Sequence, residues 1–193
     1  MRLHLLADVS YQAKLVRFIE NHDEPRAATE FGSKARAAAV TIASSPGAKL
    51  FHDGQFEGRK TKLPVLLSRR PDEPIDTDLR EFYRKLLAAI HIPAMRDGAW
   101  QLCERTGWRY NPSHTHIVAW CWRTDDDRCL IVVNLSENQS QARVRVPWDD
   151  VVGRSWRLID AITGQVFERD GGELRGPWLY VDLPPWGFHC LRL

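Results

Sequence analysis

The sequence predicts an α/β part followed by an all-β part, and two observations lead to this prediction. Two short apolar stretches, residues 14–19 and 48–51, each end in a polar loop that precedes a segment with helical spacing. Repeated strand–loop–helix units favour a parallel sheet with crossover helices. From Asp97 onward, alternation with a period of two and turn residues replace the helical spacing, which is typical of antiparallel strands.

The first elements follow from short local patterns. Residues 2–13 are predicted to be the tail of a helix, and residues 14–19 a short strand whose side chains Leu15, Val16, Phe18 and Ile19 are largely buried. Residues 30–44 are predicted to be helical, because alanine, the best helix former, is frequent there. A proline and a glycine then end this helix before the second strand, residues 48–51.

Residues 78–90 form the clearest predicted helix. Asp78 lies three residues before Glu81, as an N-cap with its capping-box partner would, and Pro93 follows as the expected end of the helix. Apolar residues recur at i, i+3, i+4, i+7, i+8 and i+11, namely Leu79, Phe82, Tyr83, Leu86, Leu87 and Ile90. Such a continuous stripe requires a sheet or other helices to cover it.

The second part is predicted to be an antiparallel β-sandwich of about seven short strands. Residues 142–146 alternate strictly, so one face of that strand is expected in water and the other in a core. Turns are expected at residues 125–127, 163–164 and 170–172. The expected strands are residues 108–110, 116–123, 128–135, 142–146, 156–159, 178–183 and 188–193. We expect two domains, 1–96 and 97–193, with the sandwich holding a core of its own.

Composition and charge exclude several classes of protein. The 193 residues are 44% apolar and 27% charged, with a formal net charge of +2, which is ordinary globular composition. The basic residues are scattered, whereas a nucleic-acid groove needs a concentrated basic face, so we expect a neutral partner and no nucleic acid. No stretch approaches the roughly 20 apolar residues of a membrane span, and the start lacks a signal-peptide pattern. We therefore expect a cytoplasmic protein without membrane contact, although a signal in an upstream segment would change this.

The four cysteines are predicted to be buried free thiols. Cys103, Cys121, Cys129 and Cys190 show no Cys-x-x-Cys spacing, which argues against zinc binding and dithiol redox chemistry. No metal and no other cofactor is expected. A bridge between Cys121 and Cys129 across a hairpin is the alternative, and it would require an oxidising compartment.

The most informative segment is residues 17–26, where an apolar strand changes into a polar turn that carries Asn21, His22 and Asp23 side by side. In α/β barrels the active site lies at the carboxyl ends of the strands. The segment resembles the fourth of the short motifs that mark the alpha-amylase family, glycoside hydrolase family 13, in which Phe-x-x-Asn-His-Asp ends the seventh barrel strand. This resemblance implies that residues 1–96 are the last two βα units of a (β/α)8 TIM barrel and that residues 97–193 are the C-terminal β-sandwich domain.

The length implies that much of such a barrel lies elsewhere. An eight-fold barrel needs roughly 250 residues, and only residues 1–20 precede the Asn-His-Asp motif. We therefore expect the chain to correspond to the back end of a longer enzyme, whose missing N-terminal barrel portion would be a partner of this one.

The resemblance also implies the roles of single residues. Retaining glycosidases need a nucleophile and a general acid about 5 Å apart, and in the family these come from the fourth and fifth barrel strands, whose motifs are absent from this sequence. Asp23 matches the third carboxylate, which stabilises the transition state, and His22 binds the same sugar beside it. His52 and Asp53 follow the second strand and, with Asn21, complete the predicted substrate-binding set. The chain alone is expected to be inactive.

Two questions remain open at this stage. Asn21, His22 and Asp23 also fit a plain turn whose side chains cap the following helix. Among the eight tryptophans, Trp148, Trp178 and Trp186 lie near turns, where exposed rings could stack on sugars.

Two hypotheses for the function follow. The first is the C-terminal part of an alpha-amylase-like retaining glycoside hydrolase or transglycosylase that acts on alpha-glucans. The second is a non-catalytic glucan-binding or interaction module derived from that family. The sequence identifies neither the glucan nor whether the reaction is hydrolysis or glycosyl transfer. That distinction depends on acceptor subsites, which would lie in the barrel repeats absent from this sequence.

Overall fold

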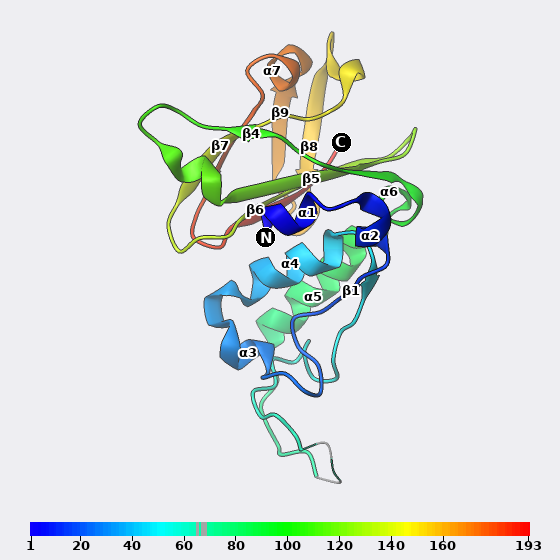
Figure 1. The fold of residues 1–193 in the computed structure, drawn as a ribbon, viewed down its shortest axis with the longest axis vertical. Helices are drawn as coiled ribbons and strands as arrows, with labels where there is room; N and C mark the ends of the chain where they lie inside the picture. The colour runs from blue at the N-terminus through cyan, green and yellow to red at the C-terminus, as the bar shows by residue number, and fades with distance from the viewer. Residues whose placement is uncertain (65, 67–68) are drawn as a thin grey trace.

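The computed structural model describes residues 1–64, 66 and 69–193, and it places a helical part below a part made of two β-sheets (Figure 1). The helices are α1 (Arg2–Leu5), α2 (Val9–Ala13), α3 (Ala27–Glu30), α4 (Ala35–Ser44), α5 (Thr77–Ile90), α6 (Pro93–Asp97) and α7 (Gly171–Arg175), with 3-10 turns η1 (Gly32–Lys34), η2 (Pro112–His116) and η3 (Asp149–Val151). The strands are β1 (Val16–Arg17), β2 (Ala48–Lys49), β3 (Ala99–Leu102), β4 (Arg105–Thr106), β5 (Ile117–Arg123), β6 (Arg128–Asn134), β7 (Ser140–Val144), β8 (Ser155–Asp160), β9 (Val166–Asp170), β10 (Leu179–Leu183) and β11 (Phe188–Arg192).

The first two strands are parallel, as predicted, but shorter than predicted. Val16 pairs with Ala48 and Arg17 with Lys49. The prediction of a largely buried first strand is wrong for Val16 and Phe18, which are 57% and 39% exposed, while Arg17 is buried. Burial of the Arg17 guanidinium is tolerated because the group donates to the Pro46 carbonyl oxygen at 2.6 Å and to the side chain of Gln12.

The helical segments differ from prediction at their ends. The helix predicted over residues 30–44 is divided into α3, η1 and α4, and Gly32 has a φ of 51° at the division. A left-handed residue of this kind interrupts a right-handed helix, and glycine adopts it at little cost.

The helix α5 begins two residues earlier than the capping-box pattern indicated. Its N-cap is Asp76, whose side chain accepts a hydrogen bond from the Leu79 amide at 2.9 Å, so the prediction of Asp78 as N-cap is wrong. Asp78 lies instead in the first turn, where its negative charge complements the helix dipole. At the other end α5 stops at Ile90, and Pro93 opens α6 rather than ending α5.

The two remaining sheets are antiparallel. The larger has the strand order β3-β5-β6-β11-β8-β9 and the smaller β10-β7-β4. Residues 125–127 and 163–164 lie in the connections between β5 and β6 and between β8 and β9, as predicted. Two predictions were wrong: residues 108–110 form no strand, with Trp108 making a single bridge to Asn111, and Asp170 caps α7 instead of forming a hairpin turn. The strands β3, β4 and β9 were not predicted.

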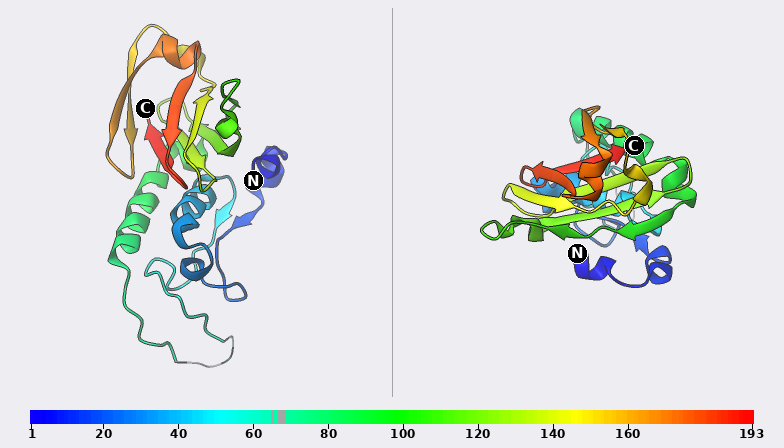
Figure 2. Two further views of the ribbon diagram at one scale, coloured as in Figure 1. Left: turned by 90° about the vertical axis from the view of Figure 1, so that its left-hand side faces the viewer. Right: turned by 90° about the horizontal axis from the view of Figure 1, so that it is seen from above.

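Two cores hold these layers together, and they lie on opposite faces of the larger sheet. One core lies between the two sheets, where Leu130 of the larger sheet is clustered with Val144 and Val181 of the smaller one. The other joins the larger sheet to the helices, with Ile131 packed in the same cluster as Leu86. Figure 2 shows the sheets above the helices in a second orientation.

The helical part is therefore attached to the β part by buried contacts. The indole Nε1 groups of Trp120 and Trp122 both donate to the Ser44 carbonyl oxygen at the end of α4, at 3.0 Å and 2.7 Å. The core between the two sheets is made of residues of the second part alone, in line with the predicted core of the sandwich. The other face of the larger sheet has a further core that it shares with α4 and α5. The domain boundary at residues 96 and 97 stays a prediction.

All four cysteines are buried and free. Cys103 and Cys121 belong to the core between the sheets, and Cys129 and Cys190 to the core under the helices. Cys121 and Cys129 thus face opposite sides of the same sheet, which excludes the alternative of a bridge between them. Burial raises the pKa of the Cys129 and Cys190 thiols well above the usual range, so both stay protonated and unreactive.

Candidate functional site

The Asn-His-Asp segment forms a turn in the loop that follows β1. The Asn21 side-chain oxygen accepts hydrogen bonds from the backbone amides of Asp23 and Glu24, at 2.8 Å and 2.9 Å. This Asx turn holds the next two side chains outward: His22 and Asp23 are 67% and 70% exposed, and His22 Nε2 lies 3.2 Å from Asp23 Oδ2. The imidazole and the carboxylate therefore form a pair that remains accessible to a ligand.

The cap of the following helix comes from Glu20 and not from the Asn-His-Asp side chains. The buried Glu20 carboxylate accepts from the Ala27 amide at the start of α3 and lies 3.0 Å from the Arg26 guanidinium. The turn interpretation is thus right for Asn21, whereas His22 and Asp23 cap no helix. Burial raises the pKa of Glu20, and the Ala27 hydrogen bond and the Arg26 charge oppose that shift.

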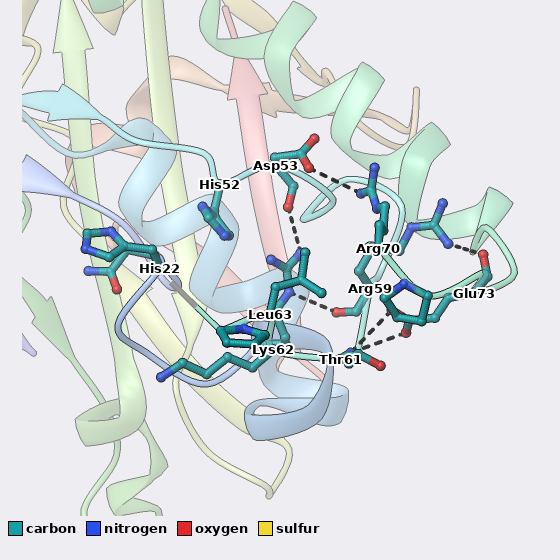
Figure 3. A pocket seen from close by; sticks show the side chains of 13 residues that line it. His22, His52, Asp53, Arg59, Thr61, Lys62, Leu63, Arg70 and Glu73 are labelled. Carbon is teal, nitrogen blue, oxygen red and sulfur yellow. Dashed lines mark hydrogen bonds and ion pairs between the residues drawn. The ribbon is translucent and has the colours of Figure 1, made fainter. Parts of the chain in front are cut away.

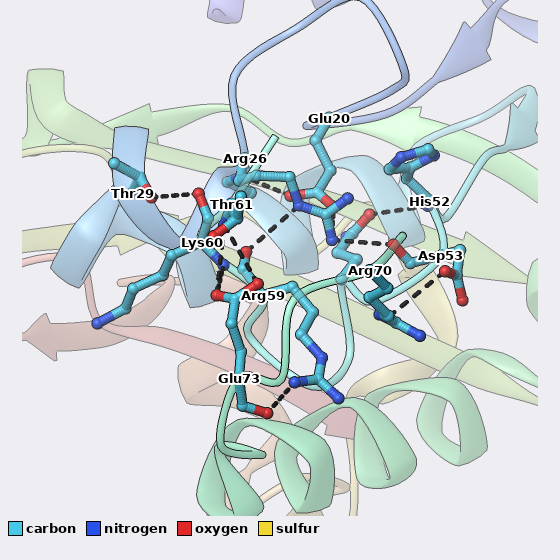
Figure 4. A network of polar contacts seen from close by, with 12 residues as sticks. Glu20, Arg26, Thr29, His52, Asp53, Arg59, Lys60, Thr61, Arg70 and Glu73 are labelled. Atoms are coloured by element: carbon cyan, nitrogen blue, oxygen red, sulfur yellow. Dashed lines mark hydrogen bonds and ion pairs between the residues drawn. The ribbon is translucent and has the colours of Figure 1, made fainter. Parts of the chain in front are cut away.

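Arg26 connects this turn to the loop after β2. Its Nη2 donates to the Asp53 carbonyl oxygen at 2.9 Å and its Nε to the Arg59 carbonyl oxygen at 3.3 Å. Figure 4 shows the resulting network, in which Arg26 lies between Glu20 and the loop that carries His52 and Asp53. A buried, paired arginine of this kind fixes the distance between the two loops.

The loop after β2 is also anchored to α5. Gln55 is buried, and its side-chain nitrogen donates to the Tyr83 hydroxyl at 2.9 Å while its oxygen accepts from the His52 amide at 3.2 Å. Burial raises the pKa of Tyr83 to about 12. The geometry of this loop therefore depends on Tyr83, through its hydrogen bond with Gln55. The sequence analysis assigned Tyr83 only to the apolar stripe of the helix.

These two loops and the segment before α5 enclose a pocket of about 280 Å³ (Figure 3). Of the predicted site residues, Asn21, His22, His52 and Asp53 line it, and Asp23 stands beside His22 outside the lining. The remaining lining residues are Arg26, Arg59, Thr61, Lys62, Leu63, Pro64, Arg70, Pro71 and Glu73. The sequence analysis interpreted residues 59–74 only as a connection between elements. The basic side chains of this segment were the signal that could have indicated its part in the pocket.

The carboxylates that line the pocket are not arranged as a nucleophile and a general acid. Asp53 is ion-paired with Arg70 at 3.4 Å. The Lys60 amide, which donates to Glu73 at 2.8 Å, is the main cause that lowers the pKa of Glu73. A general acid needs a raised pKa, so Glu73 is unsuited to that task. The described lining offers hydrogen-bonding groups rather than a cleavage pair.

Within the part of the chain that the structure describes, neither a metal site nor a membrane-spanning helix is present. No three or more His, Cys, Asp or Glu side chains gather as metal ligands. No described helix has the length and apolar character that crossing a bilayer requires.

The tryptophans near turns do not form the exposed set that the sequence suggested. Trp148 is buried, and Trp178 and Trp186 are half-buried, so the open question is answered against Trp148. Lys34 lies over the Trp186 ring, 5.2 Å from its centroid. Trp108, which the analysis placed in a strand, is the exposed tryptophan among the described residues.

Comparison with known proteins relates this chain to alpha-amylases and similar enzymes. The chain is 28% identical over 177 residues to alpha-amylase MalA of Haloarcula japonica, a match that covers 84% of the chain and 26% of that protein. The maltogenic alpha-amylase AmyB of Thermotoga neapolitana superimposes with a TM-score of 0.72 at 16% identity, over 92% of this chain and 41% of that one. The chain corresponds to the C-terminal part of an alpha-amylase family protein.

Further structures of the family agree on the fold. The alpha-amylase of Geobacillus thermoleovorans, solved in complex with acarbose, has a TM-score of 0.69 at 13% identity, over 95% of this chain and 41% of that one. No protein-family model matches the sequence. The chain spans about a quarter of the length of MalA and less than half of these structures, and its β-rich second part fits the C-terminal domain of the family.

Proposed function

We propose that the chain supplies the C-terminal part of an alpha-glucan-active retaining glycoside hydrolase or transglycosylase. In this proposal residues 1–96 are the last two βα units of the catalytic barrel, and residues 97–193 are its C-terminal β-sandwich. The Asn-His-Asp turn contributes half of a sugar subsite, and the nucleophile and general acid come from barrel strands outside this sequence. The protein would act in the cytoplasm.

The observation that carries the proposal is the exposed pair of His22 and Asp23 in the loop after β1. The turn made by Asn21 presents both side chains together, and neither His22 nor Asp23 caps a helix. An imidazole and a carboxylate at this spacing can bind neighbouring hydroxyls of one sugar ring. A carboxylate there also favours the positively charged transition state over the neutral ground state, which is how binding energy accelerates a reaction.

His52 and Asp53 complete the substrate contacts in this proposal. Both line the same pocket as Asn21 and His22 and come from the loop after the neighbouring strand β2. Because β1 and β2 are parallel, their carboxyl ends lie at the same edge, where barrel enzymes bind substrates. The structures that share this fold include one alpha-amylase in complex with acarbose and one debranching enzyme soaked with acarbose, which supports a carbohydrate as the ligand.

One observation favours the second hypothesis of a non-catalytic glucan-binding module. The helical part shares a buried core with the larger sheet and is bonded to it through Ser44. Such a core gives residues 1–96 a support that does not depend on further barrel strands.

The experiment that separates these hypotheses joins this chain to the preceding barrel strands of its parent protein and measures the hydrolysis of a maltoside. We expect activity in which Asp23→Ala and His22→Ala lower kcat by at least 100-fold and change KM little, because both groups act mainly in the transition state. His91→Ala is the matched control, since His91 is an exposed histidine at the end of α5. A wild-type kcat in the Asp23→Ala protein would overturn the assigned role.

A further inference from the structure

The outer face of the smaller sheet presents a row of side chains that the site described above does not use. Along β10, Leu179, Val181 and Leu183 are buried, whereas Tyr180 and Asp182 point away from the core. The neighbouring strand β7 contributes to the same face, because Arg143 is paired with Tyr180 and Gln141 with Asp182 in register. In Figure 1, β4 and β7 lie in the upper part of the molecule, far from the lower loops that line the pocket.

Two aromatic rings are held together on this face. Trp108, in the segment that follows β4, packs edge-on against Tyr180, with ring centroids 5.9 Å apart and an interplanar angle of 73°. Each residue remains 38% exposed, and the Arg143 guanidinium carbon lies 5.7 Å from the Trp108 centroid. Because neighbouring side chains already hold these partly exposed rings in place, the rings lose little conformational freedom when a ligand stacks on them.

Fixed polar groups surround the rings. Asp182 accepts from the Gln139 side-chain nitrogen at 2.8 Å and from the Gln141 side-chain nitrogen at 3.1 Å, and the Tyr180 hydroxyl lies 3.4 Å from it. The Arg143 Nη1 donates to the Pro177 carbonyl oxygen at 2.9 Å. These bonds orient the groups, and a carboxylate, two amides and a guanidinium keep further donors and acceptors for a ligand.

We propose that this Trp108–Tyr180 surface, made of Trp108, Tyr180, Asp182, Gln141 and Arg143, binds a neutral oligosaccharide. A sugar ring has an apolar face of C–H groups that matches an exposed aromatic ring, and a rim of hydroxyls that matches amide, carboxylate and guanidinium groups.

The charge of this surface supports a neutral ligand. One cation, Arg143, stands beside one anion, Asp182, so their charges offset each other. A phosphate-bearing ligand or a nucleic acid would need an excess of positive charge. The site itself does not depend on the proposed function, but the choice of an α-linked probe rests on it.

The test titrates the complete chain with maltoheptaose and, separately, with cellohexaose, while NMR follows the indole N–H signals. The Trp108 signal is assigned by its loss in Trp108→Phe. We expect a saturable shift of the Trp108 signal and no shift of Trp120 or Trp122, which are buried. A shift with cellohexaose alone would support a neutral oligosaccharide as the ligand but would overturn the choice of an α-linked one. A Trp108 signal that neither sugar moves would overturn the proposal.

Variants separate this surface from the pocket. Tyr180→Ala and Asp182→Asn are each expected to weaken the saturation of the Trp108 signal at least fivefold, with thermal unfolding as the check that each variant is folded. Tyr11→Ala, at an exposed tyrosine of α2, is the matched control and should leave the affinity unchanged. His22→Ala should also leave it unchanged, so that failure of the pocket proposal and failure of this one are distinct results. An unchanged affinity in both Tyr180→Ala and Asp182→Asn would overturn the assignment.

Discussion

Removal of both indole donors to Ser44 should destabilise the protein by more than the sum of the two single changes. Ser44 is buried at the end of α4, and its carbonyl oxygen accepts from Trp120 and Trp122. Trp120→Phe or Trp122→Phe alone leaves this oxygen with one donor. The net loss of one hydrogen bond is about 0.5–1.5 kcal/mol, to which each variant adds the effect of its smaller ring.

The double variant leaves the carbonyl oxygen buried without either donor. A buried unsatisfied group costs about 1–3 kcal/mol, and this cost is present only when both indoles are absent. We therefore expect a coupling free energy of about 1 kcal/mol or more between Trp120 and Trp122. The sign is destabilising, so the double variant should unfold at a lower denaturant concentration than additivity predicts.

Urea denaturation followed by far-ultraviolet circular dichroism measures the four free energies of unfolding in this cycle without relying on tryptophan fluorescence. Trp156→Phe is the matched control, because its Nε1 donates at 2.8 Å to a different carbonyl oxygen, that of Val151. Its effect should add to that of Trp122→Phe within about 0.3–0.5 kcal/mol. The same additivity between Trp120→Phe and Trp122→Phe would refute the reasoning, since the Ser44 carbonyl would then have another way to be satisfied.

Three further predictions concern activity, pH and the core. The chain alone should show no maltoside hydrolysis above a buffer control. Without a nucleophile and a general acid, positioning of the sugar cannot lower the activation free energy by the roughly 8 kcal/mol that enzymes provide at minimum. Turnover that Asp23→Ala abolishes would contradict this. Burial, followed by the charge of Arg17, lowers the pKa of Lys49 to about 8. The unfolded chain, with a lysine pKa of about 10.4, therefore binds the proton more tightly, so the free energy of unfolding should rise between about pH 8 and pH 10. Lys49→Met should flatten that rise in urea denaturation, and an unchanged slope would argue against the assignment. A fragment of residues 97–193 should aggregate in sedimentation experiments, because it uncovers the face that carries Trp120 and Ile131; a monomeric, stable fragment would show that the shared core is dispensable.

The sequence predicted those elements whose residue spacing or composition is distinctive along the chain. The stripe of α5 follows from its helical spacing. The long strands β5 and β6 are buried along nearly their whole length, and they follow from their runs of apolar residues. The edge strand β3 was missed, since its exposed and half-buried residues alternate without a buried set. Two acids stand at the start of α5, Asp76 just before it and Asp78 in its first turn, and the sequence alone gives no geometry to decide which one caps the helix.

The candidate site was predictable to the same extent. The Asn-His-Asp turn carries its own chemistry, since Asn21 forms an Asx turn with the residues next to it. The Glu20–Arg26 pair was not predictable as buried, because charged residues in a loop are usually solvated. The packing of the loop after β2 over Arg26 buries both, and that packing is a tertiary contact. The exposed Trp108 was missed for a similar reason, because it follows β4, a strand too short to give a pattern.

The exposed apolar residues of the first segment bear on the choice between the two functional hypotheses. Leu3, Leu6, Val16 and Phe18 are all more than a third exposed and lie within one short stretch of chain. Single exposed apolar residues are ordinary, but a concentration of them is typical of a surface that another protein surface covers. A glucan would not match Leu3 or Leu6, because aliphatic side chains offer it neither a flat ring nor a hydrogen bond. The core shared with the larger sheet explains how residues 1–96 are held. The exposure of this apolar stretch is what the first hypothesis expects, since that hypothesis requires a contact with further barrel strands. The first hypothesis accounts for both features, and the module hypothesis accounts only for the shared core.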